Sequence, residues 1–192
     1  MSGNLNYNLF FDFHETFKYQ GFKDINPEDS FLSNMERKLE ASGQFFHLAD
    51  LISLEILFCS SGCHKFFGVD REKVSPAVYL CQTHPDDFKR HSVGRGKLFK
   101  MASDMYIDKK DKRIISTHFK TWDSKGECRE LLYQLCFFYA EVPYRTVLSI
   151  QVNTDVTHLI NFKHGYHYYA GDDLSYFRYP DSEMLQTGNI FS

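Results

Sequence analysis

Several features that would assign this 192-residue chain to a class at once are lacking. No apolar run approaches the about 18 residues of a membrane-spanning helix, and the polar N-terminus has no signal-peptide core. Basic residues are not in excess, because 22 Lys and Arg stand against 25 Asp and Glu. The resulting net charge of -3 is not that of a nucleic-acid-binding surface. If the protein acts on DNA, we expect its DNA-reading part to lie outside this chain.

Cysteine offers no disulfide framework. The five cysteines are odd in number and irregularly spaced; they are Cys59, Cys63, Cys81, Cys128 and Cys136. Such usage is typical of reduced thiols in a cytoplasmic protein. We therefore expect a soluble, cytoplasmic chain.

Motifs for metal binding and catalysis are lacking too. The Cys and His residues of 59–64 and of 164–167 have partial ligand spacings that fall short of a four-ligand zinc set. There is no nucleophile elbow, no glycine-rich phosphate loop and no zinc-protease motif. The adjacent Asp86 and Asp87 are interpreted as helix caps and not as a carboxylate pair. We expect neither an enzyme nor a metal centre.

Aromatic residues are abundant, with 19 Phe and 12 Tyr, as suits a sheet-rich core. The stretch 113–157 predicts three strands, at 114–122, 130–139 and 146–152, which are rich in β-branched and aromatic residues. Asp123 to Gly126 has turn chemistry, with Gly supplying a positive φ. Together these segments predict an antiparallel meander.

The remaining elements are predicted from spacing and capping residues. Strands are expected at 44–50 and 53–58, short helices at 63–68 and 70–74, and a longer helix from 88 to about 102 that is capped by Asp86 or Asp87. A further hairpin is expected within 162–178. This order predicts an α+β domain with helices on one face of an antiparallel sheet.

A helix is also predicted over 28–42, with one apolar stripe that must cover either the body of the domain or a second subunit. Alternation divides the strands into two faces. We assign the following residues to the inner, helix-covered face: Ile115, Thr117, Phe119, Thr121, Leu131, Tyr133, Leu135, Phe137, Tyr139, Leu148, Ile150 and Val152. The opposite face is also apolar, which indicates a cover such as the 28–42 helix or a second copy.

Several of these segments together resemble a PAS domain over residues 44–158. They are Phe45-Phe46, Gly62 with Phe66-Phe67-Gly68, His84-Pro85-Asp86-Asp87, Lys125-Gly126 and Asp155-Val156-Thr157. The resemblance implies a sensory module in which a five-stranded sheet and its helices enclose a pocket for a small ligand or cofactor. It also implies dimerisation, with Asp155 and Thr157 marking the exit of the signal. Residues 1–43 and 159–192 then form extensions.

The end of the chain resembles the region before the helix-turn-helix domain of LuxR-type regulators, which commonly begins after a pair such as Phe191-Ser192. The chain is thus expected to be the ligand-sensing, dimerising input of such a regulator. The alternatives are the PAS module of a histidine kinase or nucleotide cyclase, and, from another class, a small α+β enzyme. The enzyme would need a buried acid or base, and the inner strand faces as assigned offer none.

The candidate pocket residues are Phe119, Tyr133, Leu135 and Phe137, all of which could equally be ordinary core. The cofactor is unknown. Haem is disfavoured because His91, although on the helix from which some haem-binding PAS domains ligate iron, is interpreted as a surface or interface residue. Flavin photochemistry is disfavoured because the Asn-Cys-Arg-Phe-Leu context is missing. Cys63 is interpreted as a buried, inert thiol, and His84 as a structural residue before its helix.

Overall fold

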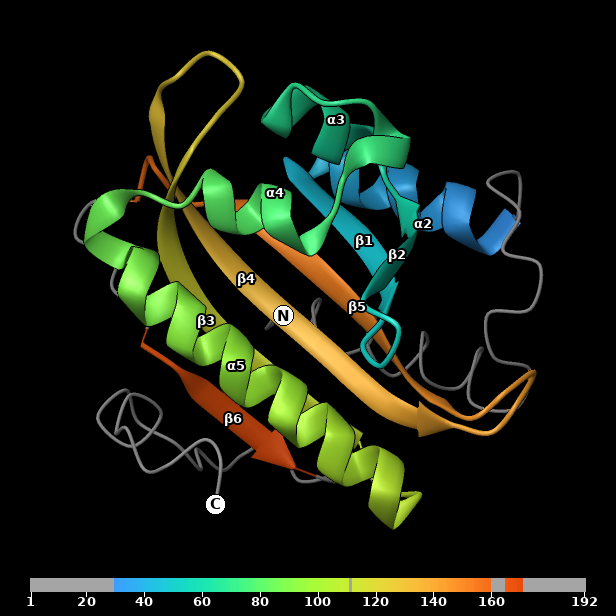
Figure 1. Ribbon diagram of the computed structural model, residues 1–192. Coiled ribbons are helices and arrows are strands. Elements are labelled where there is room, and N and C mark those ends of the chain that lie inside the picture. Colours follow the sequence, from blue (N-terminus) through green and yellow to red (C-terminus); the bar gives the residue numbers. More distant parts are fainter. Residues whose placement is uncertain (1–29, 111, 160–164, 171–192) are drawn as a thin grey trace, which may run out of the picture.

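A computed structural model describes residues 30–110, 112–159 and 165–170. In these ranges a single antiparallel sheet has the strand order β2-β1-β5-β4-β3-β6 (Figure 1). The strands are β1 Gln44–Asp50, β2 Glu55–Cys59, β3 Lys112–Trp122, β4 Cys128–Ala140, β5 Thr146–Asp155 and β6 His167–Ala170. The helices are α2 Ser30–Ala41, α3 Ser61–Phe67, the 3₁₀ turn η1 Arg71–Lys73, α4 Pro76–Cys81 and α5 Pro85–Asp108.

The five predicted strands and the PAS-like α+β architecture are confirmed. The predicted turn between β3 and β4 is present, and Gly126 adopts a φ of 77°, a conformation that glycine tolerates without strain. β6 pairs antiparallel with β3 and extends the sheet beyond the five strands. The rest of the hairpin predicted over 162–178, and residues 1–29, lie outside the described residues.

The helices differ from the prediction at the start of α5. The N-cap is His84, whose Nδ1 accepts a hydrogen bond from the Asp86 backbone N–H at 3.2 Å. The prediction that Asp86 or Asp87 caps this helix is therefore wrong, whereas the structural role of His84 is confirmed. Asp87 instead accepts the Lys120 backbone N–H at 2.8 Å and so ties α5 to β3. The short helix α4 was not predicted, because six residues are too few for a periodic signal.

Two hydrophobic cores lie back to back on the sheet. On one face, α3, α4 and α5 cover the sheet, and α2 lies on the other (Figure 1). The apolar stripe of α2 is Leu32, Met35 and Leu39, and all three side chains are buried against the sheet. The 28–42 helix therefore covers the body of its own domain.

One strand was assigned to the wrong face. Leu148, Ile150 and Val152 of β5 lie in the core under α2, not in the helix-covered core. The pairing of Leu135 with Gln151 places the alternate set of β5 under α5. This set is Val147, Ser149, Gln151 and Asn153, and three of its four members are polar. A pattern rule that puts apolar residues under the helices fails here, because one strand presents a polar face to them.

Candidate ligand-binding site

A small cavity of about 40 Å³ lies between α5 and the sheet. Three of the four predicted pocket residues, Phe119, Tyr133 and Leu135, line it. The fourth, Phe137, is fully buried in the same core but does not reach the cavity. The structure thus brings these side chains together at one place, and their role in binding a ligand stays a prediction.

His91 of α5 lies in this cavity wall with only 1% of its surface exposed, so its interpretation as a surface or interface residue is wrong. Its ring stacks on Phe119 at a centroid distance of 4.3 Å. Thr83 Oγ1 donates to the Tyr79 carbonyl, so the His91 Nδ1–H must donate to Thr83 Oγ1 at 2.7 Å. The other nitrogen, Nε2, accepts from Arg95 Nε at 3.1 Å. Both ring nitrogens of His91 are therefore engaged.

A second buried histidine, His47 of β1, faces the same core and was not singled out by the sequence reasoning. Its Nδ1 lies 2.7 Å from the hydroxyl of Tyr79. Burial, followed by the nearby charge of Arg95, lowers the pKa of His47 to about 3 and that of His91 to about 2. The inner faces assigned from the sequence covered only β3, β4 and β5; His47 lies on β1, where it shares a face with Phe45 and Ala49.

Arg95 of α5 is the charged group of this interior. It is 9% exposed, and its Nη2 donates to Gln151 Oε1 at 3.3 Å, in addition to the bond from Nε to His91. Gln151 in turn donates to Asn153 Oδ1 at 2.8 Å. The guanidinium carbon also lies 5.6 Å from the centroid of Tyr79. The polar face of β5 is thus the hydrogen-bonding partner of a buried cation.

Tyr166 covers one side of the cavity, and Gly94 makes room for it. A Cβ atom built on Gly94 would lie 1.9 Å from the Tyr166 hydroxyl oxygen. That hydroxyl donates to the Arg90 carbonyl at 3.3 Å. The sequence carries a signal for this contact, since glycine is costly inside a helix and indicates close packing.

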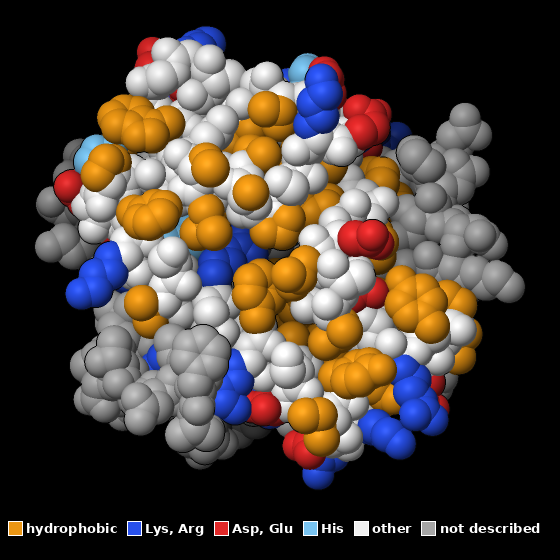
Figure 2. Space-filling view, viewed as in Figure 1, with side chains coloured by type: hydrophobic (Ala, Val, Ile, Leu, Met, Phe, Trp, Pro, Cys, Tyr) orange, Lys and Arg blue, Asp and Glu red, His pale blue; other side chains and the backbone are white. Residues whose placement is uncertain are grey.

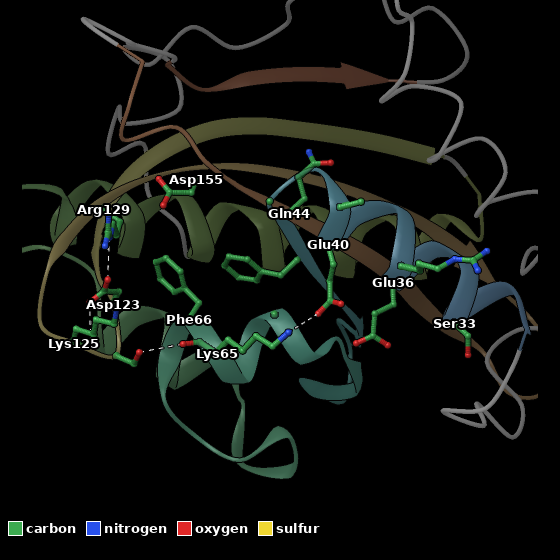
Figure 3. A pocket seen from close by; sticks show the side chains of 16 residues that line it. Ser33, Glu36, Glu40, Gln44, Lys65, Phe66, Asp123, Lys125, Arg129 and Asp155 are labelled. Carbon is green, nitrogen blue, oxygen red and sulfur yellow. Dashed lines mark hydrogen bonds and ion pairs between the residues drawn. The ribbon is translucent and has the colours of Figure 1, made fainter.

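A larger open groove of about 870 Å³ lies between α2, α3 and the β3–β4 hairpin (Figure 3). Its walls carry ion pairs, among them Lys65 with Glu40 at 3.3 Å and Arg129 with Asp123 at 2.9 Å. These charges are already paired with one another, so the groove offers a ligand fewer unpaired charged groups than the smaller cavity does. We therefore take the smaller cavity as the candidate site.

The predicted signal exit lies at the end of β5. Asp155 lies on the wall of this groove and accepts the Thr157 backbone N–H at 2.9 Å (Figure 3). Thr157 Oγ1 accepts the Glu130 backbone N–H at 2.9 Å, so the pair fastens the chain to β4 after β5 ends. Their part in passing a signal stays a prediction.

Within the described ranges, no group of three or more His, Cys, Asp or Glu side chains is arranged to hold a metal ion. The interpretation of Cys63 as buried is confirmed, and its thiol donates to the Phe46 carbonyl at 3.3 Å. Its hydrogen bond to Cys59, together with burial, raises the pKa of the Cys59 thiol. None of the helices in this part of the chain is long and apolar enough to cross a membrane.

Comparison with known proteins finds no matching family model and no matching curated protein. Solved structures with a similar fold include a PAS domain from Colwellia psychrerythraea, 13% identical, with a TM-score of 0.43 over 67% of this chain and 99% of that one. An RNA-binding light-oxygen-voltage receptor is 18% identical, with a TM-score of 0.42 over 62% of this chain and 31% of that one. The Vibrio cholerae VqmA dimer, described as a LuxR-type receptor, is 9% identical, with a TM-score of 0.39 over 66% of this chain and 52% of that one.

The chain therefore spans under a third of the light-oxygen-voltage receptor and about half of VqmA. The fold of this chain follows from its own strand order and helix placement. The chain has a PAS-like α+β fold, with a small, mostly apolar cavity under α5 that Arg95 and Gln151 line at one end.

Proposed function

We propose that this chain is a sensory input module that binds a small ligand in the cavity between α5 and the sheet. The observation that carries the proposal is the buried polar network of Arg95, His91 and Gln151 beside a small cavity. Burial of polar groups, and above all of a charge, is costly unless they are hydrogen-bonded and the charge is paired. A ligand that changes the packing of α5 would bias the domain between two arrangements.

Native mass spectrometry of the protein purified from its own host tests for the ligand. We expect a mass above that of the 192-residue chain, which disappears in the variant Leu98→Phe because the larger ring fills the cavity that Leu98 lines. The matched control is Phe99→Leu, on the same helix but outside this cavity. The bare chain mass in the wild type, or an adduct that Leu98→Phe retains, would overturn the proposal.

The output that we propose is transcriptional, through a LuxR-type helix-turn-helix domain in another part of the protein. It rests on the resemblance of the sequence near Phe191-Ser192 and on the place of Asp155 and Thr157 at the end of β5. A reporter gene controlled by the complete protein tests it. Asp155→Ala should uncouple reporter output from ligand while the native mass spectrum keeps its adduct. A normal ligand response in Asp155→Ala would contradict this path.

A homodimer in the cytoplasm is part of the proposal. The apolar stripe of α2 is already buried on its own sheet, so a dimer contact must use other surfaces. Sedimentation of the chain measures this directly, with the mass of two chains expected. The mass of a single chain at micromolar concentration would rule out a dimer formed by this module.

We propose a binding role for the two buried histidines in place of a catalytic one. A general base works best when its pKa lies near the operating pH. With pKa values of about 3 and 2, His47 and His91 are far from that range. Their ring nitrogens are also committed to Tyr79, Thr83 and Arg95, which suits a scaffold that orients the guanidinium.

A further inference from the structure

Arg95 is a buried cation that has no counter-ion in the part of the chain that the structure describes. Among the described residues no carboxylate bonds to it; its partners are the neutral His91 and the amide of Gln151. The titratable groups whose charges bear on Arg95 are three tyrosines, Tyr79, Tyr133 and Tyr166. A guanidinium stays protonated in proteins, so the interior holds a full positive charge. Charges taken out of water are ordinarily paired with an opposite charge.

The guanidinium also has donors to spare. Its Nη1 makes no hydrogen bond to the described residues, whereas Nε and Nη2 each make one. Arg95 lines the cavity of about 40 Å³ and also a second one of about 10 Å³, nearer β1 and α4. Figure 2 shows basic side-chain atoms at the bottom of a hollow between α4 and α5, ringed by hydrophobic side chains. The Arg95 side chain, which has this unused donor, therefore borders empty space.

The remainder of the cavity is apolar. Leu98, Ile115, Phe119 and Leu135 form its walls, opposite the polar end at Arg95 and Gln151. A water molecule needs roughly 10–15 Å³ on this measure, so 40 Å³ accepts an occupant of only a few heavy atoms. A short aliphatic acid fits both halves of this description, because it combines a negative, hydrogen-bond-accepting head with a small apolar tail.

We propose that the cavity binds a short-chain monocarboxylate, of two to about four carbons, with its carboxylate on Arg95 Nη1 and its alkyl group against Phe119 and Leu98. This inference rests on the proposed sensory function and names the class of ligand. The carboxylate supplies the missing counter-ion, and it accepts hydrogen bonds in a geometry that suits a guanidinium. The apolar walls favour a carboxylic acid over an inorganic anion, because burial of an alkyl group adds to its binding.

Sodium propionate is the probe, and propionamide is its neutral counterpart of the same shape. Isothermal titration calorimetry and thermal melting are measured on the 192-residue chain at constant ionic strength, with sodium chloride as the salt control. We expect propionate to bind and raise the melting temperature, and propionamide and chloride to do neither. Equal binding of propionamide, or no binding of propionate, would overturn the inference.

The decisive variant is Arg95→Met, which keeps an unbranched side chain of similar length but no charge. We expect its affinity for propionate to fall on the order of 100-fold. Without ligand we expect it to melt at a higher temperature than the wild type, since the unpaired buried charge is gone. Lys100→Met, at an exposed position of the same helix, is the matched control and should leave propionate binding unchanged. Undiminished binding by Arg95→Met would overturn the assignment.

Arg95→Lys keeps the inference testable if Arg95→Met fails to fold. It retains the positive charge on a shorter reach without the planar fork, so propionate should still bind, on the order of 10-fold more weakly. Affinity equal to that of the wild type would contradict a bond to Arg95 Nη1. A neutral adduct in native mass spectrometry together with no propionate binding would overturn the ligand class and leave the sensory function standing. Absence of both would remove both proposals.

Discussion

The two faces of one sheet are packed by different chemistry. Under α2 the core is mostly apolar, with side chains such as Phe46, Leu48 and Ile150 fully buried. Under α5 the core includes a guanidinium, two histidines and the polar face of β5, and it leaves cavities. The face under α2 contributes stability mainly through the burial of apolar surface. The face under α5, with its buried polar groups and cavities, forgoes some of that stability, as is typical of functional sites.

The largest expected difference between the two faces is the dependence of the free energy of unfolding on pH, because only the face under α5 holds His47 and His91. His47 and His91 have folded-state pKa values below the ordinary 6.5, so the unfolded chain takes up protons below pH 6.5 and the folded chain does not. Their stabilisation is therefore present above pH 6.5 and is lost as pH falls. Each histidine costs about 1.4 kcal/mol per pH unit in this window. Between pH 7 and 5 the free energy of unfolding should fall by about 4 kcal/mol for the two together.

Urea unfolding at pH 7 and pH 5 measures this loss. The window lies above the ordinary pKa values of carboxyl groups, and the pKa values of Asp70 and Asp123 are lowered further by their hydrogen bonds and cationic neighbours. The variant His91→Gln should show roughly half of the pH-dependent loss, because one of the two titrating groups is gone. Equal stability of the wild type at both pH values would contradict the burial of these histidines as neutral groups.

The second prediction compares neighbouring residues of β5 that face opposite cores. Ile150→Ala should lower the free energy of unfolding by about 3 kcal/mol, because it leaves a cavity in the core under α2. Gln151 faces the core under α5, so Gln151→Ala should change the free energy of unfolding by less. It should also weaken the binding of any ligand that depends on Arg95. Chemical denaturation of both variants measures the difference. A larger loss of unfolding free energy in Gln151→Ala than in Ile150→Ala would contradict this comparison of the two faces.

The smallest effect concerns the two glycines of α5. Gly94→Ala should destabilise the fold by about 1–3 kcal/mol, since its methyl group collides with Tyr166 and overpacks the cavity wall. Gly96→Ala is the matched control: nothing lies within 4 Å of its added Cβ atom, and alanine is the better helix former by about 1 kcal/mol. Thermal melting should therefore shift in opposite directions for the two variants. A shift of the same sign would show that Tyr166 yields without cost.

Much of the fold was predictable because its signals are local. Turn residues such as Gly68, with a φ of 70°, and Gly126 bound the elements, and alternating side chains fix β3 and β4. The face of β5 was mispredicted because Ser149, Gln151 and Asn153 reach partners far away in sequence, among them Arg95 and the Phe45 carbonyl. A strand whose polar set faces inward cannot be distinguished by its own pattern from one whose polar set faces water.

The amino-acid sequence by itself determined the strands, the hairpin turn, the apolar stripe of α2 and the PAS-like order of the elements, since each depends on residues close together in the chain. Only the tertiary structure decided that α2 covers its own sheet, and that His91 and Arg95 are buried beside a cavity. Burial of the Arg95 charge depends on partners that the fold brings from α4 and β5. No local pattern records such partners, and they are what make the face under α5 a candidate site.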